Sequence, residues 1–234
     1  MLAAACVPEG PPTEGSVTLP EQTIVVEAGG DTIKGVFFDD FDREEIGEDY
    51  EVLSDAWSIS EGWLCAQGAR NRGAWLTKRL PPSVRIEFDA MALSDDGDIK
   101  VEVFGDGASG ATGASYDDAT GYIAIFGGWR NTLHAIARLD EHGDNRRTLA
   151  VDPASDDPVS QPVRAGQPYH FKLERRLSAS PSRGEGTKLV MSVNGQVVLD
   201  FVDPEPLDGA GHDHFGFNEW TAPVCFDNLE IAPL

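Results

Sequence analysis

The sequence lacks any run of 18 or more apolar residues, so no segment is long enough to cross a membrane as a helix. Basic residues are scarce: 18 Lys and Arg stand against 40 Asp and Glu, which leaves a formal net charge of −22 at pH 7. Nucleic acids and anionic membrane surfaces are bound through clustered Lys and Arg, so this balance argues against nucleic acid as a partner.

Helical periodicity is also nearly absent, and the sequence has no HExxH zinc motif and no P-loop, Rossmann or serine-hydrolase signature. The composition is that of a globular protein, with 41% apolar and 25% charged residues. A length of 234 residues is sufficient for one large all-β domain with a substantial core.

The sequence does contain many short strands bounded by Gly, Pro, Asp and Asn. Val84, Ile86 and Phe88 alternate with charged residues, as in a strand with one buried face. Asn194-Gly195 favours a type I′ hairpin turn. Fifteen candidate strands without intervening helices predict an all-β antiparallel β-sandwich or jelly roll. The predicted strands are 23–28, 33–38, 57–59, 63–66, 74–80, 84–92, 99–104, 122–126, 132–139, 147–151, 169–175, 188–193, 196–201, 214–219 and 224–231.

The same alternation predicts charged faces on several strands. We interpret these faces as solvated surfaces with cross-strand ion pairs rather than as a functional cleft. The loops 108–120 and 140–162 are expected to be mobile. The charged residues concerned are Arg85, Glu87, Lys100, Glu102, Lys172 and Glu174.

The first six residues, MLAAAC, are typical of the end of a bacterial lipoprotein signal, in which small residues precede an acylated cysteine. The basic region and most of the apolar region of such a signal are missing, which indicates a late start or a trimmed chain, and Ala3 stands where the motif usually has Leu. Residues 7–15 form a Pro/Gly/Glu tether. We therefore expect 1–20 to be signal remnant and tether, Cys6 to be lipidated, and 21–234 to form the folded domain.

If Cys6 carries lipid, Cys65 and Cys225 remain, and both lie in predicted strands. An envelope compartment permits a disulfide between them. The sequence does not show whether the two residues meet, and two buried free thiols are the interpretation we favour.

Three segments carry a resemblance: FDDFD at 38–42, WSISEGWL at 57–64 and FDNLEI at 226–231. Their order resembles bacterial members of the concanavalin A-like lectin/glucanase superfamily, over about residues 35 to 234. The resemblance implies a jelly roll. It does not imply one function, because the superfamily includes lectins, glycoside hydrolases, polysaccharide lyases and structural domains.

The resemblance also implies that the first and last strands lie side by side. This would bring Asp39 or Asp40 near Asp227, where carboxylates and backbone carbonyls could hold a structural calcium ion. The alternative is that these side chains bind the amides of turns.

Glycoside hydrolases of the laminarinase-like branch of this superfamily carry an E-x-D-x-x-E motif with the catalytic carboxylates. The segment 87–92 keeps Glu87 and Asp89 but has Ala92 in place of the proton donor, so the two-carboxylate mechanism loses a partner.

The loop FGGWRN at 126–131 is the segment most like a binding site. Glycine permits a sharp turn, Trp129 offers a flat face, and Arg130 and Asn131 offer planar donors. A lyase would need His or Tyr as base beside Arg or Asn, and His134 and Tyr122 are residues of the right type. The alternative is a hairpin tip with a half-buried Trp.

Near the end of the chain, His212 and His214 share one face of a predicted strand, but a third zinc ligand is not evident. The following Asn218, Glu219 and Trp220 are interpreted as a polar and stacking patch near Trp129.

The sequence therefore predicts one concanavalin A-like sandwich in a bacterial cell envelope, lipid-anchored or secreted, with noncatalytic glycan binding or surface display as its role. The alternatives are a glycoside hydrolase or polysaccharide lyase with an unrecognised site, and a structural envelope protein with no small ligand. Carbohydrate is the expected partner, and structural calcium is the one cofactor considered. The candidate glycan contacts are Trp129, Arg130, Asn131, Asn218, Glu219 and Trp220, and the candidate metal ligands are Asp39, Asp40 and Asp227.

Overall fold

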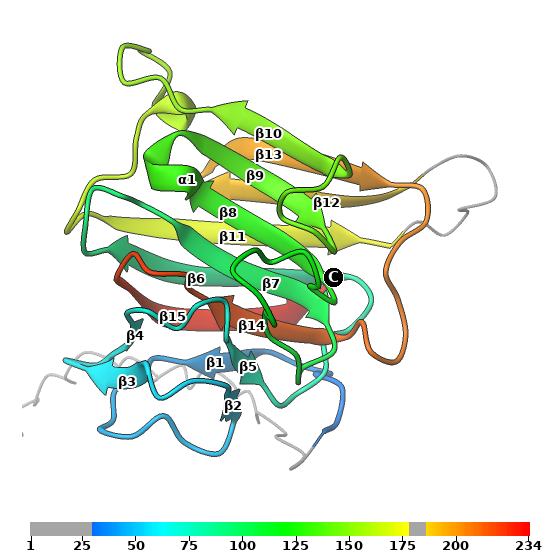
Figure 1. Cartoon of the computed structure of the whole chain (residues 1–234). Helices are drawn as coiled ribbons and strands as arrows, with labels where there is room; N and C mark the ends of the chain where they lie inside the picture. Colours follow the sequence, from blue (N-terminus) through cyan, green and yellow to red (C-terminus); the bar gives the residue numbers. More distant parts are fainter. Residues whose placement is uncertain (1–29, 178–185) are drawn as a thin grey trace, which may run out of the picture.

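The computed structural model describes residues 30–177 and 186–234, which form two antiparallel sheets packed face to face (Figure 1). The predicted strand 23–28 and the predicted tether lie outside these residues. In order across the first sheet, the strands are β13 (Gln196–Asp203), β12 (Thr187–Val193), β11 (Pro168–Arg176), β6 (Val84–Ala92), β15 (Val224–Pro233), β4 (Trp63–Ala66) and β3 (Trp57–Ser60), with β1 (Phe37–Asp39) also paired to β15.

The second sheet has seven strands and forms the front layer in Figure 1. In order, they are β10 (Arg146–Ala150), β9 (Leu133–Arg138), β8 (Tyr122–Gly127), β7 (Ile99–Gly105), β14 (His214–Asn218), β5 (Ala74–Leu76) and β2 (Tyr50–Val52). Two short turns complete the elements, α1 (Gly128–Asn131) and η1 (Pro158–Ser160). No helix in the described part of the chain is long and apolar enough to cross a membrane.

The core lies between the sheets and follows from the alternation of β6. Val84, Ile86 and Phe88 are each about 1% exposed, whereas the charged residues between them are only partly buried. Phe88 stacks on Phe171 with ring centroids 4.9 Å apart. Its ring also contacts those of Phe215, Phe217 and Phe226, which come from both sheets. This aromatic cluster therefore joins the two layers, and the predicted antiparallel sandwich is confirmed.

The predicted hairpin turn is also confirmed. Asn194 and Gly195 have φ values of 50° and 79°, as a type I′ turn requires, and they join β12 to β13. Near the other end of the chain, Phe37 of β1 pairs with Ile231 of β15, so the first and last strands lie side by side.

The prediction for the charged residues is right on one sheet and wrong on the other. On the first sheet, Arg85 contacts Glu87 at 2.6 Å and Glu230 at 2.5 Å, at a partly exposed surface. Lys100 and Glu102 belong to the second sheet and are 3% and 0% exposed. Alternation placed them correctly on the side away from the core, but a loop covers that side.

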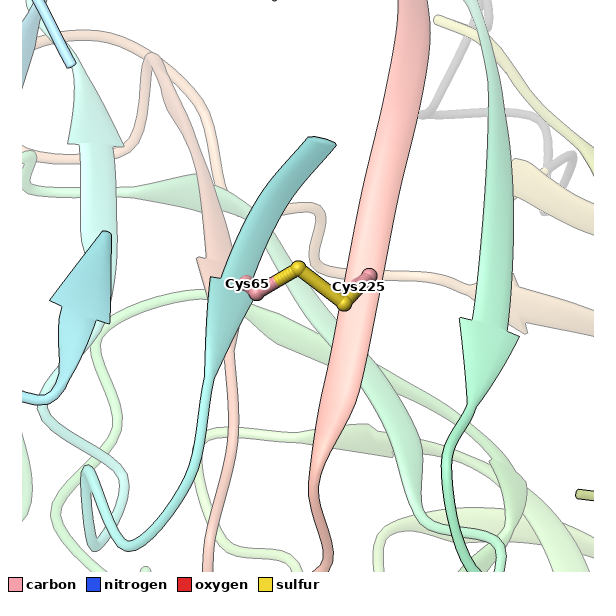
Figure 2. The surroundings of a disulfide bond; sticks show 2 residues. All are labelled: Cys65 and Cys225. Atoms are coloured by element: carbon pink, nitrogen blue, oxygen red, sulfur yellow. A yellow bond between two sulfur atoms is a disulfide. The ribbon is translucent and has the colours of Figure 1, made fainter. Parts of the chain in front are cut away.

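Cys65 and Cys225 form a disulfide (Figure 2), so the favoured interpretation of two free thiols was wrong. The two residues lie directly opposite one another on β4 and β15, with Cα atoms 4.0 Å apart. Their neighbours Leu64 and Phe226 point into the core, so the disulfide lies on the outer surface of the first sheet. It connects the N-terminal hairpin to the last strand.

Candidate functional site

The outer side of the second sheet carries a small apolar cluster of its own. Residues 106–121, which connect β7 to β8, fold back over this side instead of extending into solvent. Tyr116, within the connection, is 1% exposed, so part of the loop 108–120, which we expected to be mobile, is packed against the sheet. The buried members of the cluster are Ala111, Tyr116, Ala119, Ile123, Ile125 and Ala135.

Glu102 holds this connection to the sheet. One carboxylate oxygen accepts the backbone N–H groups of Thr120 at 3.0 Å and Gly121 at 2.7 Å, and the other accepts the hydroxyl of Tyr116. Burial raises the pKa of Glu102 to about 7, although the bonds from Tyr116 and Gly121 act in the opposite direction. The connection is therefore fixed through a buried carboxyl group.

Beside the connection lies a pocket of about 570 Å³. Its walls come from the connection itself, from the turn after β8, from the segment after β9 and from the segment after β14. The lining residues are Asp96, Asp98, Lys100, Ala114, Ser115, Ile125, Trp129, Arg130, Glu141, His142, Trp220, Thr221 and Ala222. The volume falls in the range of small-molecule sites.

Lys100 forms the floor of the pocket. Its ammonium lies 2.9 Å from both the side-chain oxygen of Asn71 and a carboxylate oxygen of Glu141, and 4.0 Å from Asp98. Burial lowers the pKa of Lys100, but the carboxylates of Asp98, Glu141 and Glu219 raise it by more, so the net shift is upward and the group stays charged. The floor therefore carries a fixed positive charge that the protein itself already neutralises.

Asp98 is a partly buried carboxylate in the pocket without a hydrogen-bond donor among the described residues. Its ion-pair partner is Lys100 at 4.0 Å. The side chain is 15% exposed, and burial raises its pKa while Lys100 acts in the opposite direction. Asp98 is therefore available to accept hydrogen bonds from a ligand.

Two half-buried tryptophans line the pocket, and the ring of each contacts an arginine. The guanidinium of Arg146 lies 5.5 Å from the ring of Trp129, and that of Arg70 lies 5.5 Å from the ring of Trp220. Arg146 also donates to the carbonyl oxygen of Glu141 at 2.8 Å. These contacts limit the motion of both indoles and present flat apolar surfaces at the pocket.

Trp129 sits on a strained turn. Trp129, Arg130 and Asn131 have φ values of 50°, 57° and 61°, so three successive non-glycine residues are left-handed. Each such residue costs of order 1 kcal/mol, and strain of this kind concentrates at functional sites. Gly127 precedes the turn, and a Cβ there would lie 2.5 Å from Cγ2 of Val163.

Asn131 keeps the turn in place rather than lining the pocket. Its amide donates to the carbonyl oxygens of Asp95 at 3.0 Å and Val163 at 2.6 Å, and its oxygen accepts the N–H of Val163 at 2.9 Å. His134 supports the same turn by accepting the N–H of Gly127 at 2.9 Å. Burial lowers the pKa of His134 to about 4, so it is neutral near pH 7.

The structure therefore brings together three of the six candidate glycan contacts: Trp129, Arg130 and Trp220 all line the pocket. Asn218 and Glu219 are 2% and 0% exposed and lie outside the lining. A carboxylate oxygen of Glu219 accepts the N–H of Ala69 at 2.5 Å, which fixes the segment that carries Trp220. The lining residues Asp98, Lys100 and Glu141 were not among the candidates.

The side chains of the candidate calcium ligands are bound within the protein. Both carboxylate oxygens of Asp39 are bound by Arg43, at 2.5 Å and 2.8 Å, and one also accepts the N–H of Phe41. Asp40 and Asp227 bind the backbone amides that follow them in the chain, at 3.1 Å and 2.7 Å. Within 30–177 and 186–234, no group of three or more His, Cys, Asp or Glu side chains could hold a metal ion. Asp39 does not fit a calcium site, because Arg43 already neutralises it.

The incomplete hydrolase motif lies far from the pocket, on the outer surface of the first sheet. Asp89 lies 2.8 Å from Nδ1 of His170 and accepts the side-chain amide of Asn228 at 3.0 Å. Glu87 contacts Arg85 at 2.6 Å. Both carboxylates are therefore paired with neighbouring side chains of the first sheet.

No family model matches the sequence, and no curated protein matches it either. Solved structures do match the fold. A carbohydrate-binding module, CBM66, from Bacillus subtilis superposes with a TM-score of 0.54 at 14% identity, covering 80% of this chain and 98% of that one. The carbohydrate recognition domain of Emp47p gives a TM-score of 0.53 at 13% identity, covering 85% and 94%. A variant of the alginate lyase Aly36B in complex with alginate trisaccharide gives 0.52 at 13% identity, covering 86% and 98%.

Proposed function

We propose that this protein is a noncatalytic glycan-binding domain. Its sandwich fold is similar to those of a carbohydrate recognition domain and a carbohydrate-binding module. The observation that carries the proposal is the pocket of about 570 Å³ with Trp129 and Trp220 in its lining and charged groups at its floor. Sugar rings have apolar C–H faces and polar edges. An indole packs against such a face, while carboxylates and guanidinium groups bind the hydroxyls.

The structural role considered at first is not favoured by this arrangement. A purely structural envelope protein would be expected to show a flat charged surface and buried tryptophans. Here both tryptophans are half-buried at a hollow, and the strained turn carrying one of them is held by a dedicated asparagine.

We also propose that the domain works outside the cytoplasm, in a bacterial cell envelope, anchored through lipid on Cys6. The Cys65–Cys225 disulfide supports this location, because disulfides persist in oxidising compartments. Cys6 lies outside the described residues, so the anchor rests on the sequence. Labelling with a fatty-acid analogue tests it: the wild type should be labelled and partition with membranes, and Cys6→Ser should do neither.

The experiment for glycan binding is an array probed with the full chain. We expect binding to a defined set of oligosaccharides, lost in Trp129→Ala and retained in Trp63→Ala. Trp63 is the matched control because it is a half-buried tryptophan on β4 of the other sheet. If no glycan binds across a broad array, the glycan-binding proposal is wrong and a structural envelope role becomes the better account.

One observation favours a second candidate, a carbohydrate-active enzyme. Asp98 lines the pocket, and burial raises its pKa, as a general acid requires. Assays for new reducing ends and for unsaturated products decide between the two. Turnover that is abolished in Asp98→Asn, a variant that keeps the shape of the side chain, would make this protein an enzyme. Binding without turnover would support the noncatalytic role.

A further inference from the structure

The pocket contains more acidic than free basic groups. Asp96, Asp98 and Glu141 belong to its lining, and against them stand Lys100 and Arg130. Lys100 donates hydrogen bonds to Asn71 and Glu141, so its charge is already paired within the protein. Arg130 is exposed at the rim and can turn toward solvent.

One carboxylate of the pocket also lacks a hydrogen-bond donor within the described part of the chain. The side chain of Asp98 receives no hydrogen bond from a described residue. Outside the lining, a carboxylate oxygen of Glu219 and the side-chain oxygen of Asn218 are also buried without hydrogen-bond partners in the described structure, as is the side-chain nitrogen of Asn71. Glu219 is close enough to Asp98 and Lys100 for their charges to shift its pKa. Asp98 is therefore an acceptor without a hydrogen bond in a pocket with more acidic than basic groups, and a ligand group that brings a donor and a positive charge would satisfy it.

We infer that the pocket takes a glycan carrying a protonated amino group, as in a glucosamine unit, with Asp98 as the residue that determines this preference. The inference rests on the proposed function and names its ligand class. An ammonium beside Asp98 forms a charge-assisted hydrogen bond. Trp129 and Trp220 add cation–π attraction, which is strongest on indole rings.

The same arrangement disfavours uronate glycans. A ligand carboxylate would meet Asp98 and Glu141, while Lys100 between them is already paired. Like charges brought together in a partly desolvated site repel one another, which weakens binding. The overall net charge of −22 acts in the same direction at long range.

Isothermal titration calorimetry with matched hexasaccharides tests the inference. Oligomers of cellulose, chitin and chitosan share a β-1,4-linked glucose backbone and differ only at carbon 2, which bears hydroxyl, acetamido or ammonium. We expect the chitosan oligomer to bind at least about tenfold more tightly than the other two at low salt. Added sodium chloride should reduce this preference, and an alginate oligomer should bind most weakly.

Asp98→Asn should abolish the preference for the amine, so that the chitosan oligomer binds no more tightly than the cellulose oligomer. Asp200→Asn is the matched control, because it makes the same change of charge at an exposed position on β13 of the other sheet and should keep the preference. If the three oligomers bind equally, or if chitin or alginate oligomers bind best, the amine inference is wrong and the glycan-binding proposal stands. If none of these sugars binds but another array glycan does, the inference is likewise wrong; if no glycan binds at all, the proposed function fails.

Discussion

The carboxyl group of Glu102 should make stability depend on pH in an unusual direction. Its pKa is raised from 4.5 to about 7 in the folded protein because it is buried. The folded state therefore keeps a proton on Glu102 at pH values where the unfolded state has lost it. By proton linkage, this contribution to stability is complete below about pH 4.5, decreases as the pH rises, and is lost above about pH 7.

The size of the contribution of Glu102 to the free energy of unfolding follows from its pKa shift. Each pKa unit corresponds to about 1.4 kcal/mol, so moving from 4.5 to about 7 amounts to roughly 3 kcal/mol for this 0% exposed side chain. Glu102→Gln cannot titrate and keeps an oxygen to accept the N–H groups of Thr120 and Gly121. The difference in unfolding free energy between variant and wild type should therefore shift by 2–3 kcal/mol in favour of the variant between about pH 5 and about pH 8.

Urea unfolding followed by tryptophan fluorescence, with the disulfide intact, measures this difference. Other carboxyl groups with raised pKa values, such as Asp98, contribute equally to both proteins and cancel in the subtraction. Glu51→Gln, at an exposed position on β2 of the same sheet, is the control and should show no pH-dependent difference. If the free energy of unfolding of the wild type and of Glu102→Gln changed with pH in the same way, the reasoning would be refuted.

Three further predictions concern the fold. Phe88→Ala should lower the free energy of unfolding by about 3–5 kcal/mol in urea titrations, because Phe88 contacts aromatic rings of both sheets; a loss below about 1 kcal/mol would contradict the role assigned to it. Replacing Cys65 and Cys225 together by Ser should cost up to about 5 kcal/mol, because the disulfide closes a sequence separation of 160 residues; an unchanged thermal midpoint would show that this link does not constrain the unfolded chain. Because Asp39 is already bound by Arg43, neither added calcium nor a chelator should shift the thermal midpoint, and a rise with calcium would establish the structural ion that the resemblance suggested.

The fold was predictable because its signals are local. Strict alternation along β6 fixes which residues enter the core, and Asn194-Gly195 fixes one hairpin. The disulfide was not predictable, because it depends on β4 and β15 being neighbours with Cys65 opposite Cys225. That register is set by residues about 160 positions apart in the chain.

In the candidate site too, residues with a local sequence signal were found, and residues brought together only by the fold were missed. Trp129 and Arg130 were found because glycine, indole and guanidinium occur together in one short loop, and Trp220 because it follows a predicted strand. Lys100 and Glu141 come from segments 41 residues apart. Alternation placed Lys100 on the outer side of its strand, but only the folded connection 106–121 decides that this side is buried.

The most direct test of the central claim is a calorimetric titration of an array-selected oligosaccharide into the wild type, Trp129→Ala, Trp220→Ala and Trp63→Ala. If the pocket is the glycan site, each of the two pocket variants should lose at least about tenfold in affinity, since aromatic stacking contributes about 0.5–1.5 kcal/mol beyond the apolar area that the ring buries. Trp63→Ala should bind as the wild type does. Undiminished affinity in both pocket variants, or a loss confined to Trp63→Ala, would contradict the account and move the binding site to the other sheet.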